Sequence, residues 1–190
     1  WEIRNIYKGR DLQGKTLGVI GLGAIGGLVA NVAVDLGMNV IGCDPFLSVE
    51  GAWNLDKQIH KAATYEEIYE KADFITLHVP STKDTKGMIN ASTIAQMKDG
   101  VIIINNSRGA LVVEEDLAGA LKSGKVYAAG LDAVRNEPIA MDNPLLSAPN
   151  VFFTPHISWA AIECRQRLVD YSLDNLKAFL NGKPTNVVND

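Results

Sequence analysis

The chain has 190 residues, of which 47% are hydrophobic, and it carries a formal net charge of -4 at pH 7. A chain of this length can bury roughly 70% of the surface that it exposes when unfolded, so it needs no metal or disulfide to fold. Mixed charge without a basic cluster argues against a nucleic-acid partner. The apolar runs contain glycine and fall short of the ~20 residues that span a bilayer, so we expect no membrane association.

In chain order, short β-rich runs alternate with helix-like segments. The strand candidates are residues 16–20, 39–43, 74–79, 101–105, 127–133 and 151–154. The helix candidates are residues 24–37, 64–71, 92–97, 113–123 and 160–180. Nearly unbroken apolar strands separated by such helices predict an α/β fold, a doubly wound parallel sheet covered on both faces.

A glycine-rich turn, Gly21-x-Gly23-x-x-Gly26, follows the first strand candidate and opens the first helix candidate. In this context glycine permits a tight turn, close approach of the backbone to a pyrophosphate, and packing of helix on strand. The unpaired N–H groups at the start of the helix favour an anion. The pattern predicts a Rossmann dinucleotide site.

Asp44 closes the second strand candidate, where a carboxylate can accept hydrogen bonds from both ribose hydroxyls of an adenosine. The same charge repels a 2′-phosphate, which favours NAD over NADP as the cofactor. The alternative is a plain glycine turn with an aspartate that caps the next loop. The order of strand, glycine turn, helix, strand and acid favours the cofactor site.

Four polar side chains lie at or just after the ends of later strand candidates: Arg108, Asp132, Glu137 and His156. In an open parallel sheet, ligands bind beyond the carboxyl ends of the strands, so these residues are expected at one edge. An arginine fork matches a carboxylate, a histidine can protonate a carbonyl oxygen as hydride reaches the carbon, and a glutamate can hold the imidazole ring. Each residue alone also suits a structural role.

The sequence closely resembles the nucleotide-binding domain of the D-isomer-specific 2-hydroxyacid dehydrogenases over nearly all of its length. The motifs that carry the resemblance are GKTLGVIGLGAIG, HVPSTKDTKGMIN, MKDGVIIINNSRGALV, GLDAVRNEP and NVFFTPHIS. The first half is similar to the 3-phosphoglycerate dehydrogenase branch. The second half, with Trp159 after Ser158, is similar to the glycerate dehydrogenase or hydroxypyruvate reductase branch.

The resemblance implies an NAD-dependent oxidoreductase acting on a small 2-keto or 2-hydroxy acid, of the hydroxypyruvate, glyoxylate or 3-phosphoglycerate type. The catalytic set that it implies is Arg108, Glu137 and His156. The cofactor contacts that it implies are Gly21, Gly23, Ala24, Ile25, Gly26, Asp44, Pro80, Thr85, Asn106, Asp132 and Ser158. His60 and His78 are interpreted as structural.

The chain begins at Trp1 rather than methionine, which suggests a piece of a longer protein. We expect residues 1–190 to form one dinucleotide-binding domain, with a linker at 1–14, a C-terminal helix and tail at 160–190, and no substrate-binding domain. An alternative function is an isolated, non-catalytic NAD-binding and dimerisation module. The family resemblance also implies a homodimer.

Two cysteines, Cys43 and Cys164, lie far apart and form no C-x-x-C pattern. Such cysteines are typical of packing positions in a reducing compartment rather than of a disulfide framework. We therefore expect a cytoplasmic protein. Another Rossmann enzyme, such as an S-adenosylhomocysteine hydrolase, is disfavoured by the order of Arg108, Glu137 and His156.

Overall fold

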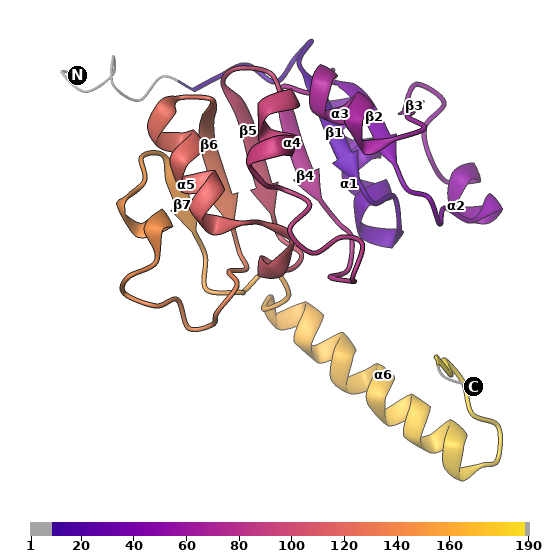
Figure 1. Cartoon of the computed structure of the whole chain (residues 1–190). Coiled ribbons are helices and arrows are strands. Elements are labelled where there is room, and N and C mark those ends of the chain that lie inside the picture. The colour runs from indigo at the N-terminus through magenta and orange to yellow at the C-terminus, as the bar shows by residue number, and fades with distance from the viewer. Residues whose placement is uncertain (1–8, 189–190) are drawn as a thin grey trace, which may run out of the picture. The chain divides into compact units, whose positions relative to one another are not determined.

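The computed structural model describes residues 9–188, in two compact units that divide between Pro155 and His156. Within the described residues, the first unit contains a seven-stranded parallel sheet in the order β3-β2-β1-β4-β5-β6-β7 (Figure 1). The chain builds outward from β1 to β3 and then crosses back to β4 beside β1. This topology confirms the doubly wound α/β sheet.

The strands are β1 (Thr16–Ile20), β2 (Asn39–Cys43), β3 (His60–Lys61), β4 (Phe74–Leu77), β5 (Val101–Asn105), β6 (Val126–Leu131) and β7 (Val151–Phe153). The helices of the first unit are α1 (Ala24–Asp35), α2 (Val49–Trp53), α3 (Tyr65–Lys71), α4 (Ala91–Gln96) and α5 (Glu114–Ser123). Two 3₁₀ turns, η2 (Gly109–Leu111) and η3 (Pro144–Ser147), lie near α5 in sequence or in space. The second unit contains α6 (Ile162–Leu180).

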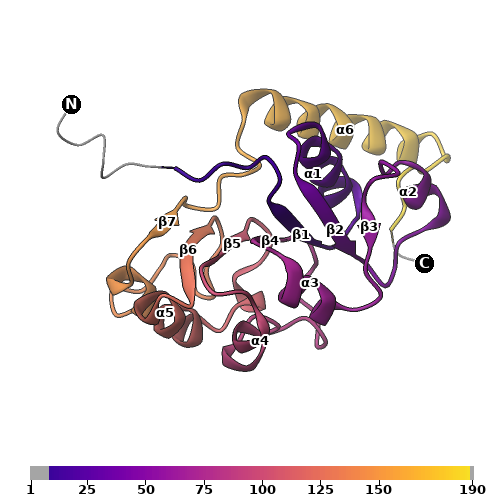
Figure 2. The ribbon, with the colours of Figure 1, turned by 90° about the horizontal axis from the view of Figure 1, so that it is seen from above.

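The central strands are buried on both faces, which is why they consist of nearly continuous apolar residues. Figure 2 shows α1 on one side of the sheet and α3, α4 and α5 on the other. Each side has its own hydrophobic cluster, with Val19 and Ala30 on the α1 side and Ile75 and Leu117 on the other. Loops that carry polar residues are therefore confined to the strand ends.

Two short elements were not predicted, α2 and β3. Ser48 caps α2 by accepting a hydrogen bond from Gly51 N at 2.9 Å, but the helix is only five residues long. The two-residue strand β3 has no apolar run and pairs with β2 at the sheet edge. His60, expected in a charged loop, lies on this strand, where its Nε2 is 2.7 Å from Glu67 Oε1. Elements this short leave little periodicity in the sequence.

The predicted linker, residues 1–14, lies partly outside the described residues. Its described part has no helix or strand, but Arg10 donates a hydrogen bond to Gly100 O at 3.0 Å. The Arg10 guanidinium also lies 3.9 Å from the centre of the Tyr127 ring. In the second unit, α6 begins two residues later than predicted and ends as predicted at Leu180, and it has no buried residue.

We expect Leu117→Ala to destabilise the first unit by about 2–5 kcal/mol, because Leu117 is fully buried on the inner face of α5 and its removal leaves a cavity. Leu146→Ala in η3 is the matched control, since Leu146 is 45% exposed; we expect a change under about 1 kcal/mol. Urea unfolding followed by circular dichroism measures both. Equal losses of unfolding free energy in the two variants would contradict the placement of Leu117 in the core.

Candidate functional site

The glycine turn between β1 and α1 is closed by contacts that only a residue without a side chain permits. Gly21 has φ +92°, and a Cβ there would lie 2.8 Å from the backbone carbonyl of His78. A Cβ on Gly26 would lie 1.9 Å from Gly21 O. The first contact sets β1 against the end of β4, and the second sets α1 against the turn.

The start of α1 is open. Gly23 is the N-cap residue and makes no side-chain cap hydrogen bond, and a Cβ built on it would meet nothing within 4 Å. Gly23, Ala24 and Ile25 are all exposed. The N–H groups of a helix start, with its partial positive charge, therefore face open space, which fits an anionic pyrophosphate.

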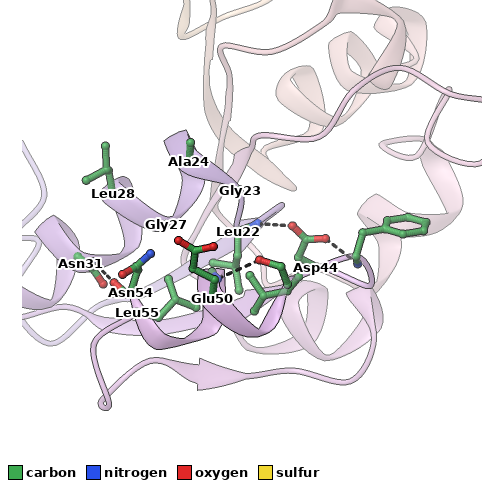
Figure 3. Close-up of a pocket in the computed structure, with 14 residues that line it drawn as sticks. Leu22, Gly23, Ala24, Gly27, Leu28, Asn31, Asp44, Glu50, Asn54 and Leu55 are labelled. Carbon is green, nitrogen blue, oxygen red and sulfur yellow. Dashed lines mark hydrogen bonds between the residues drawn. The ribbon is translucent and has the colours of Figure 1, made fainter. Parts of the chain in front are cut away.

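Asp44 lies directly after β2 and beside this turn. Its Oδ2 accepts a hydrogen bond from Leu22 N at 2.9 Å, and its Oδ1 accepts one from Phe46 N at 2.9 Å (Figure 3). Each carboxylate oxygen can accept more than one hydrogen bond, so the group retains capacity for ribose hydroxyls. The two backbone bonds fix the carboxylate in place.

A pocket of about 710 Å³ opens between α1 and the segment that follows β2. Gly23, Ala24 and Asp44 line it, together with α1 residues such as Asn31 and α2 residues such as Glu50 (Figure 3). Three of the predicted cofactor contacts therefore share one cavity. Its glycine, helix-start and carboxylate groups fit the diphosphate and ribose of a dinucleotide.

The loop after β4 carries Pro80 and Thr85. Thr85 is buried, and its hydroxyl donates a hydrogen bond to Pro80 O at 2.6 Å and accepts one from Thr82 N at 2.8 Å. These bonds make the loop compact. The contacts of Pro80 and Thr85 with a cofactor stay a prediction.

Asn106 follows β5 and lines a different pocket of about 490 Å³, whose walls include α1 and His78. His78 lies just beyond β4, which ends at Leu77 rather than at 79. Burial lowers the pKa of the His78 ring below its ordinary value, and its Nε2 lies 3.0 Å from Thr76 Oγ1. These contacts agree with a structural His78.

Arg108 and Glu137 come from loops that pack directly on each other. Gly109 lies so close to the neighbouring loop that a Cβ there would be 1.9 Å from the carbonyl carbon of Val134. Arg108 is exposed and donates from Nη1 to Ser107 O at 2.9 Å. Glu137 is exposed and its Oε1 accepts a hydrogen bond from Val134 N at 3.2 Å.

Asp132 lies just beyond β6, which ends at Leu131, and is buried with 4% of its surface exposed. Its Oδ1 accepts a hydrogen bond from Thr154 Oγ1, and Thr154 N donates to Leu131 O at 3.1 Å. Asp132 therefore anchors the chain two residues before His156. This anchoring is a role that the sequence did not indicate.

His156 is the first residue of the second unit and Ser158 lies in the turn that follows. His156 has φ +53°, a left-handed conformation that is uncommon for residues other than glycine. Trp159 Nε1 donates a hydrogen bond to His156 O at 2.8 Å. Because Arg108 and Glu137 belong to the first unit, the meeting of all three side chains stays a prediction.

Sequence reasoning missed three polar residues that hold these loops. Asn105 is fully buried, with Nδ2 donating to Arg108 O at 2.9 Å and Oδ1 accepting from Ser107 N at 3.1 Å. Ser107 Oγ donates to Val79 O at 2.6 Å. Glu114, the first residue of α5, is also buried. The available signal was a polar residue at the end of an otherwise apolar strand or run.

The glycine turn, the open helix start and the acid after β2 define a dinucleotide-binding domain of the Rossmann class. The particular family follows from comparison with known proteins. The chain belongs to the D-isomer specific 2-hydroxyacid dehydrogenase family, NAD binding domain, whose model matches residues 1–158. The predicted family and the predicted cofactor, NAD, are thereby confirmed.

Relatives come from both branches that the sequence resembles. A hydroxypyruvate reductase of Blautia hydrogenotrophica is 49% identical over 179 residues, which cover 94% of this chain and 54% of that protein. A D-3-phosphoglycerate dehydrogenase of Methanocaldococcus jannaschii is 43% identical over 190 residues, 100% of this chain and 36% of that protein.

Among solved structures, a D-lactate dehydrogenase of Aquifex aeolicus complexed with NAD and lactic acid matches with a TM-score of 0.81 and 33% identity. That match covers 93% of this chain and 56% of the other. This chain therefore spans about half the length of such relatives, or less.

Among residues 9–188, no helix combines the length and the apolar character that crossing a membrane requires. The same residues contain no group of three or more histidine, cysteine, aspartate or glutamate side chains arranged to hold a metal ion.

We expect NAD(H) to bind more tightly than NADP(H) by about 1–3 kcal/mol, because a carboxylate in the position of Asp44 can accept hydrogen bonds from ribose hydroxyls and would repel a 2′-phosphate. Isothermal titration calorimetry of the 190-residue chain measures both affinities. Asp44→Asn should narrow the difference, whereas Asp35→Asn, at the exposed end of α1, should leave it unchanged. Equal wild-type affinities for the two dinucleotides would refute the role of Asp44.

Proposed function

We propose that this chain is the cofactor-binding part of a dehydrogenase that transfers hydride between NAD(H) and a small 2-hydroxy or 2-keto acid. Hydroxypyruvate, glyoxylate and 3-phosphoglycerate define the type of substrate. The observation that carries the proposal is the packing of the Arg108 turn on the segment that leads to Glu137, beyond the carboxyl ends of β5 and β6. In a parallel sheet that edge is where ligands bind.

In the proposed reaction, each of the three residues has a separate task. Arg108 binds the substrate carboxylate with its planar fork, which matches two oxygens at once. His156 donates a proton to the carbonyl oxygen during reduction and accepts it during oxidation. Glu137 orients the imidazole. NAD(H), when bound, supplies or accepts the hydride.

The remaining proposed contacts surround the dinucleotide. Gly21, Gly23, Ala24, Ile25 and Gly26 form the cradle of the pyrophosphate, and Asp44 binds the adenosine ribose. Pro80, Thr85 and Asn106 contact the cofactor from the strand ends that follow. Asp132 holds the nicotinamide carboxamide, and Ser158 lies near the same ring. The exposed helix start and the fixed carboxylate of Asp44 support the first two of these assignments.

We further propose that residues 1–190 form the dinucleotide-binding domain and that a separate substrate-binding domain completes the active enzyme. The curated relatives are longer, since this chain spans about half of their length or less. A second domain that closes over the strand ends excludes water and fixes the substrate for hydride transfer. The isolated chain should therefore turn over slowly or not at all.

His156→Gln should lower kcat by roughly 10²- to 10⁴-fold and leave NADH affinity nearly intact, because it removes a proton donor and no cofactor contact. The measurement uses the chain joined to a substrate-binding domain, with NADH absorbance followed in the presence of 2-keto acids. His60→Gln is the matched control, since His60 lies on the edge strand β3 and pairs with Glu67.

Full activity in His156→Gln would show that His156 only packs at the end of β7. If the complete protein binds NADH but turns over none of a panel of 2-keto acids, the alternative function, a non-catalytic NAD-binding and dimerisation module, replaces the proposed one.

We propose a homodimer in the cytoplasm. Both cysteines are free, as expected in a reducing compartment. Four exposed apolar side chains form a stripe along α1 and its C-terminal end at helical spacing: Ile25, Leu28, Val32 and Leu36. Exposed apolar surface of this kind is typical of an association site.

Light scattering at micromolar concentration should give at least twice the monomer mass, because association removes this stripe from water. Adding NaCl should not dissociate the dimer, since an apolar contact is not screened by salt. A monomer mass at both low and high salt would contradict the proposal.

A further inference from the structure

A buried glutamate of α5 contacts both sides of the loop that carries Glu137. The loop runs from Val134 to Asn143, between β6 and η3. Glu114 is the first residue of α5, and only 4% of its surface is exposed. A carboxylate this buried needs several hydrogen-bond donors to offset its lost hydration.

Both oxygens of Glu114 accept hydrogen bonds from this loop. Oε1 accepts from the backbone N–H of Arg135 at 2.7 Å, and Oε2 accepts from Asn143 Nδ2 at 2.9 Å. The Arg135 guanidinium adds a cation, with Nη2 3.8 Å from Oε2. One side chain therefore fixes the loop at its beginning and at its end, on either side of Glu137.

A second contact links the fixed end of the loop to Glu137 itself. Val134, the neighbour of Arg135, donates its backbone N–H to Glu137 Oε1 at 3.2 Å. The backbone of Val134 and Arg135 is also the surface on which Gly109 packs, one residue after Arg108. A shift of this backbone would move the Glu137 carboxylate and the Arg108 turn together.

We propose that Glu114 is a positioning residue that holds the Glu137 carboxylate, and with it the Arg108 turn, in the arrangement used by the reaction. This role rests on the proposed function, in which Glu137 orients His156. Glu114 acts through the backbone of Val134 and Arg135 and touches neither cofactor nor substrate. An acid is required at this position because both neighbours that bond to it are donors.

Replacement of Glu114 by glutamine gives a sharp test. In Glu114→Gln the amide oxygen can accept one of the two hydrogen bonds, but the NH₂ group then faces a second donor. Combining it with Asn143→Asp reverses that donor and acceptor pair, because the carboxylate introduced at position 143 can accept from the new NH₂ group. The other oxygen of that carboxylate can still accept from Leu145 N, as Asn143 Oδ1 does at 3.0 Å.

The readout is amide hydrogen exchange of the 190-residue chain, resolved at Val134 and Arg135. Glu114→Gln should accelerate exchange at both amides by about tenfold, because a charge-assisted hydrogen bond is weakened. The double variant with Asn143→Asp should restore the wild-type rates. Exchange in β1 and β4, which β5 separates from β6, should change in neither variant.

Glu115→Gln is the matched control. Glu115 is the next residue of α5, carries the same charge, and binds Arg135 only through its guanidinium, at 2.5 Å from Nη2. Its loss should leave the Val134 and Arg135 amides unchanged. Glu137→Gln tests whether exchange at the Val134 amide depends on its hydrogen bond to Glu137. This variant should alter exchange at Val134 and not at Arg135.

Three results would overturn the proposal: unchanged exchange at Val134 in Glu114→Gln, an equal effect of Glu115→Gln, or failure of the double variant to restore protection. A loss of protection throughout the sheet that the double variant does not repair would assign Glu114 to general stability instead. NAD(H) binding is recorded in the same samples. Absence of binding would refute the proposed function while leaving the positioning result standing.

Discussion

The site depends on a backbone contact that admits no side chain: Gly26 packs against the carbonyl oxygen of Gly21, where a Cβ would stand 1.9 Å away. This contact brings the start of α1 onto the end of β1 and leaves its N–H groups facing outward. Gly21 in turn touches the backbone that follows β4. The strand order reverses between β1 and β4, so the glycine turn lies at the topological switch point of the sheet.

Gly109 makes a second backbone contact that admits no side chain, farther along the sheet edge. This contact allows the Arg108 turn to pack on the backbone of Val134. Around these contacts, buried polar side chains replace the hydrogen bonds that regular structure would have supplied. Asn105 holds the Arg108 turn, Asp132 holds Thr154, and Glu114 holds the loop after β6. Apolar residues could fill the same space, but they would leave backbone N–H and C=O groups without partners.

The sheet could be predicted because its signals are local. Strands β1, β2 and β5 have the predicted bounds, because a strand that is buried on both faces is a continuous apolar run between turn residues. The glycine turn and Asp44 could also be predicted, because strand, turn, helix, strand and acid follow one another within residues 16–44. In contrast, α2 and β3 were not predicted, because neighbouring residues rather than intrinsic periodicity stabilise elements of five and two residues.

Glu114 and Asp132 show a different limit of sequence reasoning. Glu114 reads as an ordinary acid at a helix start, where acidic residues are common. Asp132 was predicted as a cofactor contact, but not as a partner of Thr154. Their burial follows from loops that are distant in the sequence: Glu114 receives Asn143, and Asp132 receives Thr154. The spacing of residues along the chain does not indicate such long-range contacts. The structural contacts of these two acids were therefore harder to predict than the residues proposed to perform the chemistry.

The two parts of the site differ in how much of the chain they need. The glycine turn, the start of α1 and Asp44 all lie between β1 and α2, and the pocket at this place is formed by residues 22–55. The groups assigned to chemistry come from the ends of β5 and β6 and from the second unit, and the proposed enzyme adds another domain. Local contacts can preserve the dinucleotide pocket when the distant groups are displaced, so cofactor binding and hydride transfer are separable properties of this fold.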